Sequence, residues 1–123
     1  PYCRGLAERL PFRDASFDRV LSALMFHHLT PESKRRALQE VRRVLRPGGE
    51  LHLADFGPPG RPIMALASAI VLAIDGPART ADNFQGKLPA MAADAGFDAV
   101  ALRGRFDTVC GRLVLYSAVR PAS

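Results

Sequence analysis

Residues 17–56 read FDRVLSALMFHHLTPESKRRALQEVRRVLRPGGELHLADF, in which two apolar runs flank one amphipathic segment. Residues 17–23 form a short apolar run with little alternation, which is typical of a strand buried on both faces. Residues 50–56 are predicted to form a second strand. Between the two strands, Thr30 can cap a helix whose first position is Pro31, where a missing N–H costs nothing. This order of elements predicts a right-handed crossover between two parallel strands.

The helix of this unit has a one-sided pattern and a clear end. Its apolar residues recur at helical spacing on one face, at Ala37, Leu38, Val41, Val44 and Leu45. The run Arg46-Pro47-Gly48-Gly49 is expected to end the helix, with at least one glycine at positive φ. The basic residues Lys34, Arg35, Arg36, Arg42, Arg43 and Arg46 are expected to form its solvated face. Aromatic residues are not interleaved with them, so the net charge of +5 does not predict nucleic-acid binding.

Downstream of this unit the elements are weaker. Residues 57–60 (Gly-Pro-Pro-Gly) predict a rigid turn, and residues 63–74 are nearly all apolar but too few to span a bilayer, which needs about 20. Residues 81–96 predict a second helix, although Pro89 can mark its true start. Residues 99–105 and 112–119 are expected to pair as an antiparallel hairpin.

Composition places the chain in an ordinary class. Its 123 residues are 48% hydrophobic and 24% charged, which suits one compact domain. Cys3 and Cys110 lie far apart, and their spacing indicates neither a disulfide framework nor a zinc site. Both are therefore predicted to be reduced thiols of a cytoplasmic protein.

Three motifs in a fixed order resemble the class I S-adenosylmethionine-dependent methyltransferase family, best its group of small-molecule and quinone-type methylases. They are GLAERLPF at residues 5–12 with DASFD at 14–18, SALMFHHL at 22–29, and RVLRPGGEL at 43–51. The resemblance implies an α/β, Rossmann-like sheet with helices on both faces and the strand order 3-2-1-4-5-7-6. Strand 7 of that order runs antiparallel to the others.

On this scheme the chain is the C-terminal part of the methyltransferase fold. The strands predicted above take the places of strands 4, 5, 6 and 7 in chain order. Strands 1–3 are missing, as are the Gly-rich cofactor loop and the acidic residue that holds the ribose, and all are expected upstream of Pro1. Residues 1–123 are thus expected to form a single, incomplete methyltransferase domain.

The resemblance also implies which residues bind S-adenosylmethionine. Leu6 and Ala7 are expected against the adenine ring, although the family usually has an acidic residue where Leu6 stands, and leucine accepts no hydrogen bond. Ser22 and Ala23 end strand 4, and ligands of open α/β sheets bind outside the carboxyl ends of strands. His27 is placed beside the cofactor with them. The alternative for each position is simple packing.

The catalytic residue is unknown, and the histidine pair offers one candidate. His28 can take a proton from the acceptor at neutral pH, although a structural role is the alternative. The pair does not predict a metal site, because adjacent side chains are expected to diverge. Asp55, after strand 5, either touches substrate or ends the strand.

Two functions remain open. The first is methyl transfer to a small acceptor, which is lipophilic if residues 63–74 line its pocket. The second is a non-catalytic remnant that acts through self-association or by binding another protein. The chain alone is expected to be inactive and to bind cofactor weakly. Because strand 4 loses its neighbour, strand 1, its exposed edge predicts a homo-oligomer, most simply a dimer.

Overall fold

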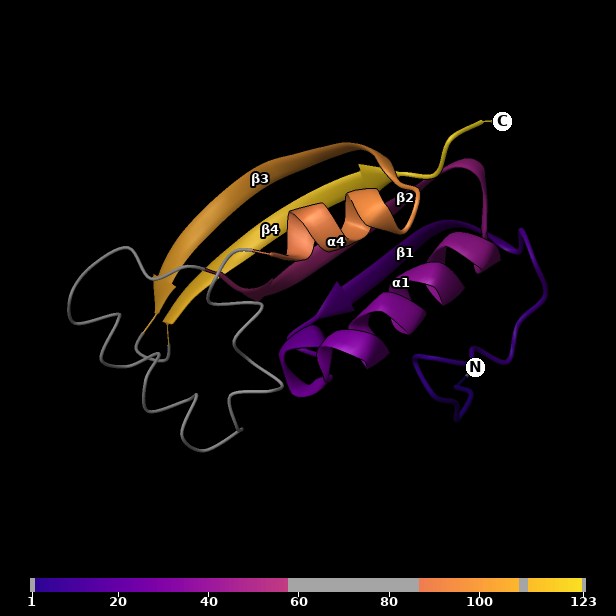
Figure 1. Ribbon diagram of the computed structural model, residues 1–123, viewed down its shortest axis with the longest axis horizontal. Helices are drawn as coiled ribbons and strands as arrows, with labels where there is room; N and C mark the ends of the chain where they lie inside the picture. Colours follow the sequence, from indigo (N-terminus) through magenta and orange to yellow (C-terminus); the bar gives the residue numbers. More distant parts are fainter. Residues whose placement is uncertain (1, 58–86, 109–110, 123) are drawn as a thin grey trace.

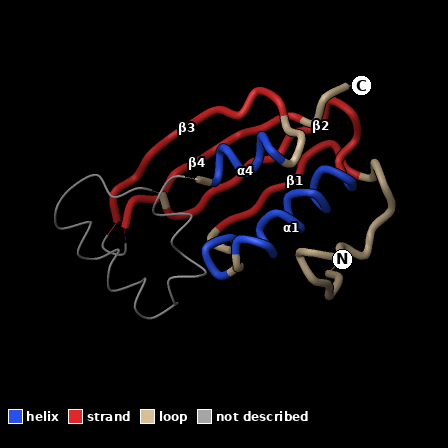
Figure 2. The backbone as a smooth tube through the Cα atoms, viewed as in Figure 1, coloured by secondary structure: helices blue, strands red, loops and turns tan. Residues whose placement is uncertain are grey.

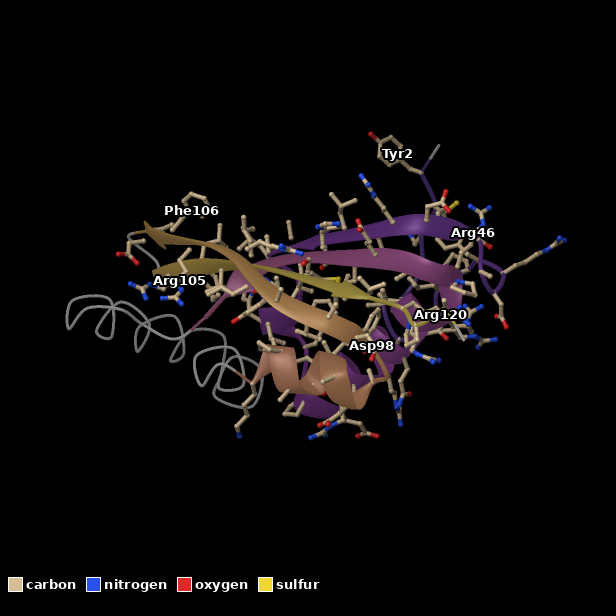
Figure 3. The ribbon with its side chains drawn as sticks, turned by 90° about the horizontal axis from the view of Figure 1, so that it is seen from above. Tyr2, Arg46, Asp98, Arg105, Phe106 and Arg120 are labelled. Carbon is tan, nitrogen blue, oxygen red and sulfur yellow. The ribbon has the colours of Figure 1, made fainter. Side chains whose placement is uncertain are left out.

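The computed structural model describes residues 2–57, 87–108 and 111–122. Within these ranges, two α-helices and a short 3-10 helix lie on one face of a four-stranded sheet (Figures 1 and 3). The elements in chain order are β1 (Phe17–Ala23), η1 (Phe26–His28), α1 (Pro31–Val44), β2 (Leu45–Phe56), α4 (Leu88–Asp94), β3 (Asp98–Thr108) and β4 (Gly111–Val119). The apolar segment 63–74, most of the 57–60 turn and Cys110 lie outside the described residues.

The sheet has the order β1-β2-β4-β3, and its directions confirm the predicted scheme. β1 and β2 are parallel, with Val20 opposite Leu51. β4 runs antiparallel to both of its neighbours, as expected for strand 7 between strands 5 and 6. The β3–β4 hairpin is confirmed and is longer than predicted, because its pairing continues to Thr108 opposite Gly111.

The helix α1 begins and ends where its capping residues and the glycine turn predict. The Thr30 hydroxyl accepts a hydrogen bond from the Ser33 N–H at 3.3 Å. At the other end Gly48 takes φ +81°, which confirms the positive φ expected in this turn. β2 starts before residue 50 because the turn itself joins the sheet: the Gly48 N–H donates to Arg120, and the Arg120 N–H donates to Gly49.

The core lies between the sheet and the two α-helices. The α1 stripe of Ala37, Leu38 and Val41 is buried with Leu51 and Leu53 of β2. Helix α4 adds Leu88, Met91 and Ala92 to the same cluster. It is shorter than the predicted range 81–96, of which residues 81–86 are not described, because Pro89 stands in its first turn and Gly96 follows its end at φ +97°.

The expectation that residues 17–23 are buried on both faces is wrong. β1 is an edge strand, and its Leu21 is 77% exposed. Val20 is half-buried and packs against the core, and Ser22 is half-buried, whereas Leu21 and Ala23 are exposed. Figure 3 shows the described helices on one side of the sheet only. An apolar run indicates that both faces of a strand are suited to burial, but actual burial depends on which elements pack against those faces.

The expected solvated basic face of α1 is also wrong in two respects. Lys34 is fully buried. Arg43, instead of pointing into water, donates hydrogen bonds to the carbonyl oxygens of Leu10 and Phe12 and to the carboxylates of Asp14 and Glu40. It thereby ties the loop before β1 to the helix, and Figure 2 shows that loop beside α1.

The C-terminal end of α1 is satisfied by an arginine from the other end of the chain. The Arg120 guanidinium donates to the carbonyl oxygens of Arg42, Arg43 and Leu45. These are among the carbonyls that a helix end leaves without an internal partner. The contact links the last turn of α1 to β4, and it adds a positive charge where the helix dipole is negative.

The Glu40–Arg43 pair predicts an acid-sensitive contribution to stability. The hydrogen bond from Arg43, helped by the N–H of Leu10, holds the pKa of the Glu40 carboxyl below its ordinary value of 4.5. A carboxyl whose pKa is lowered by folding stabilises the fold fully above that ordinary value, and this stabilisation is lost progressively as the pH falls through the lowered pKa. Glu40→Gln is therefore expected to lower the free energy of unfolding more at pH 7 than at pH 3, as measured by urea denaturation.

Glu32 provides the matched control for this measurement. Its carboxylate pairs with Arg36 one turn along the exposed face, at 2.7 Å. Exposed pairs of this kind contribute about 0.3–0.5 kcal/mol, so Glu32→Gln should change stability little at either pH. If Glu40→Gln and the unmodified chain lose stability in parallel between pH 7 and pH 3, the Glu40 contact is not acid-sensitive.

Candidate functional site

A hollow of about 260 Å³ runs along the free edge of β1. Its walls come from the loop before β1, from β1 itself, from the turn after β1 and from α1. Of the predicted cofactor residues, Leu6, Ala7 and Ser22 all line it, although Leu6 and Ser22 are far apart in sequence. The remaining lining is mostly apolar and includes Met25 and Phe26.

The loop that carries Leu6 and Ala7 is held against α1. The Arg9 N–H donates to the Leu6 carbonyl at 3.0 Å, which closes a tight turn. The Leu10 N–H donates to the Glu40 carboxylate at 2.8 Å. Leu6 is 68% exposed, so its side chain is open to solvent at the rim of the hollow. Leu6 and Arg9 form an isolated antiparallel bridge, so the backbone of Leu6 is engaged within this turn.

The residues at the end of β1 divide between two hollows. Ser22 also lines a second hollow of about 320 Å³, and Ala23 lines only this second one. His52, Ala54, Arg103 and Leu115 contribute to the second hollow, which therefore takes lining residues from all four strands of the sheet. The two hollows share Leu21 and Ser22, so they meet at β1.

His27 belongs to a buried pair with Asp55. Its ring nitrogen Nδ1 lies 2.8 Å from Oδ1 of Asp55, and the two residues are 5% and 0% exposed. Asp55 also accepts the N–H of Phe26 at 2.7 Å and the N–H of Phe56 at 2.9 Å. Because a carboxylate only accepts hydrogen bonds, Nδ1 of His27 carries the proton in this pair. His27 lines neither hollow at β1, and its cofactor role stays a prediction.

His28 is exposed and lies directly beside His27. The two ring centroids are 3.9 Å apart, so the expectation that adjacent side chains diverge is wrong here. Both residues lie in η1, where successive side chains are offset around a tight turn instead of pointing to opposite faces. The rings of His27 and Phe56 pack in an edge-to-face arrangement, with their centroids 4.9 Å apart.

Asp55 is the part of this site that the sequence left undecided. The structure buries it at the carboxyl end of β2, next to the carboxyl end of β1. The signal was available, since Asp55 stands between the apolar residues Ala54 and Phe56 near the end of the predicted strand, and an acidic residue requires hydrogen-bond donors when buried. The identity of those donors depends on η1, which the sequence did not predict.

The backbone is strained directly after β1. Leu24 takes φ +52°, although it has a side chain, and a left-handed conformation of this kind costs about 1–2 kcal/mol. Its N–H donates to the Ala54 carbonyl at 2.8 Å, and its own side chain is 48% exposed. The sharp bend is therefore held by backbone contacts to β2 and not by packing of the leucine.

The described ranges contain neither a cluster of metal ligands nor a membrane-spanning helix. No group of three or more His, Cys, Asp and Glu residues there lies close enough to hold a metal ion. None of the described helices is long and apolar enough to cross a membrane.

Known proteins resemble this chain in both sequence and structure. Residues 1–53 match a family model described as a methyltransferase domain. The ubiquinone/menaquinone biosynthesis C-methyltransferase UbiE of Ectopseudomonas mendocina is 32% identical over 133 residues, which cover 94% of this chain and 50% of that protein. Among the curated relatives first matched, the aligned part spans half or less of each relative's length.

Solved structures show the same fold at lower identity. A SAM-dependent methyltransferase from Methanosarcina mazei superimposes with a TM-score of 0.71 at 22% identity, over 95% of this chain and 65% of the other. The YcgJ protein from Bacillus subtilis gives a TM-score of 0.74 at 18% identity, over 97% of this chain and 70% of the other. With the strand order already described, the chain has the sequence motifs and the fold of class I S-adenosylmethionine-dependent methyltransferases, and its four strands correspond to strands 4, 5, 7 and 6 of their sheet.

Proposed function

We propose that this chain supplies one wall of the site of an S-adenosylmethionine-dependent methyltransferase that acts on a small acceptor. The observation that carries the proposal is the hollow along β1, which gathers Leu6, Ala7 and Ser22 from separate elements. Its mostly apolar lining suits the flat face of an adenine ring and a thioether chain. On this proposal residues 1–123 form an incomplete domain, and strands 1–3 with their Gly-rich loop complete the site.

The bound cofactor supplies a methyl group already activated on a sulfonium, so alignment of the acceptor accounts for much of the rate. In our proposal Leu6 and Ala7 pack against the adenine ring, while Ser22, Ala23 and His27 lie toward the methionine portion. An acceptor that gains a methyl group loses a proton. The exposed imidazole of His28 is our candidate to take that proton.

The acceptor is proposed to be lipophilic as well as small. The matching UbiE protein is by its name a C-methyltransferase of ubiquinone and menaquinone biosynthesis. The apolar face of β1 at Leu21 and the second hollow, with Ala54 and Leu115, offer an apolar approach to the same strand end. The exposed thiol of Cys3 is consistent with a cytoplasmic location.

The test of this proposal is a titration of the chain, labelled with 13C at the methionine methyl groups, with S-adenosylhomocysteine. Met25 lines the hollow, whereas Met91 lies in the core on α4 and does not line it. The Met91 signal therefore serves as an internal control. The Met25 signal is expected to move in a saturable way while the Met91 signal stays. If Met25 does not move at several millimolar ligand, the hollow is not a cofactor wall.

The same chain is expected to bind S-adenosylmethionine weakly, with a dissociation constant near 1 mM, or about −4 kcal/mol. Leu6 cannot accept the adenine amino group, and the described walls enclose the hollow only partly. Isothermal calorimetry on the purified chain measures this constant. A low-micromolar value, about −8 kcal/mol, would show that these residues form a complete site without help.

A second candidate function is a non-catalytic module that acts by association with itself or another protein. The specific observation in its favour is the edge of β1, where Leu21 is 77% exposed beside backbone groups that pair on one side only within the described chain. We propose that two copies of residues 1–123 meet at this edge when strands 1–3 do not cover it.

A further inference from the structure

Asp55 is buried more completely than its position in the sequence suggests, and each of its oxygens is used. Oδ2 accepts the Phe26 N–H, and Oδ1 lies within hydrogen-bond distance of both His27 Nδ1 and the Phe56 N–H. The two longer-range contacts both go to η1, the turn that follows β1. Asp55 itself ends β2, so its carboxylate connects the carboxyl ends of two adjacent parallel strands.

The segment held by Asp55 would not keep this shape unaided. Leu24 is strained at φ +52°, and it lies directly before Met25 and Phe26, which are two of the residues that line the hollow. Phe26 is fully buried, so its ring fixes the depth of that wall. A strained backbone conformation persists only where neighbouring contacts hold it in place. Here the Ala54 carbonyl accepts the Leu24 N–H, and the Asp55 carboxylate accepts the Phe26 N–H.

We infer that Asp55 is a positioning residue: by holding Phe26 and His27 it keeps the strained turn in the one conformation that presents Met25 and Phe26 to the hollow. The inference rests on the proposed function, since it assigns this wall to the cofactor. Asp55 does not touch the ligand. Its effect is to set the shape of the wall before binding, so its loss should weaken binding without removing any ligand contact.

The experiment compares Asp55→Asn with Leu88→Ala in the labelled chain. Leu88 is buried on α4 and lines no part of the hollow at β1, so its variant provides a matched loss of stability. In Asp55→Asn the Met25 methyl signal is expected to shift or broaden without ligand, and affinity for S-adenosylhomocysteine to fall at least tenfold. In Leu88→Ala both are expected to stay as in the unmodified chain, whatever its melting temperature.

Two further pairs keep the test decisive if Asp55→Asn does not fold. His27→Asn retains a side-chain N–H that can donate to Asp55, whereas His27→Leu removes it. Only His27→Leu is expected to disturb the Met25 signal. Leu24→Gly removes the penalty for positive φ, so adding it to His27→Leu should restore the Met25 signal toward its original position.

The outcomes separate this inference from the function on which it rests. An unchanged Met25 signal in both Asp55→Asn and His27→Leu overturns the inference. Equal ligand affinity in Asp55→Asn and the unmodified chain also overturns it, while the proposed function stands. If the ligand moves Met25 in no variant, the proposed function fails, and the positioning role is then decided by the ligand-free signals alone.

Discussion

Replacing Gly49 with valine is expected to unfold most of the chain at 37 °C. A Cβ at this buried position would lie 2.8 Å from the carbonyl oxygen of Arg46 and 3.0 Å from that of Asp18, and backbone atoms cannot move aside cheaply. Both carbonyls lie where β2 leaves the turn and meets β1. Overpacking typically costs about 1–3 kcal/mol, and a branched side chain here should exceed that range. Circular dichroism during heating measures the loss.

The neighbouring glycine provides the control, because it is constrained for a different reason. A Cβ at Gly48 would meet nothing within 4 Å, but the residue takes φ +81°. Gly48→Asn should melt close to the parent, since asparagine tolerates this conformation, whereas Gly48→Val should lose about 1–2 kcal/mol. If Gly48→Val and Gly49→Val both melt within about a degree of the parent, the turn does not have the conformation described.

Lysine at Leu21 is expected to convert a self-associated chain into a monomer. Leu21 is 77% exposed on the edge strand β1, and two copies that pair there about a two-fold axis would bring both leucines into the seam. Two lysines at the same place repel each other and remove the apolar contact. Sedimentation equilibrium should show a mass above 13.3 kDa for the parent and a dissociation constant at least tenfold weaker, about 1.4 kcal/mol, for the variant.

A lysine at the opposite edge of the sheet tests whether the effect is local. Leu102 on β3 is 43% exposed, and Leu102→Lys adds the same charge far from β1 in the strand order. It should leave the association unchanged. A parent chain that is folded and sediments at 13.3 kDa at every concentration contradicts the dimer, and dissociation by Leu102→Lys alone places the seam on β3.

The local elements could be predicted because their causes are local. Thr30, Pro31 and the glycine turn specify the limits of α1 within a few residues of chain, and its stripe specifies the buried face. The strand order came from the resemblance of three motifs and is confirmed by the pairing of β2 with β4. Neither periodicity nor capping could have provided that order, since it depends on contacts between residues far apart in sequence.

The errors share a physical origin in tertiary surroundings. An apolar run at 17–23 predicts which faces suit burial, but cover depends on which elements lie above and below. The basic residues on α1 were expected to be exposed to solvent because they are charged. Lys34 is instead fully buried, and the Arg43 side chain contacts the N-terminal loop. Likewise Asp55 could not be assigned from the strand alone, because its partners lie on η1.

The central place of β2 in the sheet has a consequence for the order of folding. The β1–α1–β2 unit and the β3–β4 hairpin each pair residues that are near one another along the chain, so each can form by closing a short loop. Docking β4 on β2 joins strands that lie further apart along the chain than those of either unit, and it closes the longest loop of the sheet. This step is expected to limit the folding rate. Truncation of Ala118 to glycine, at the β2–β4 seam, should therefore slow refolding more than truncation of Met91 to alanine on α4.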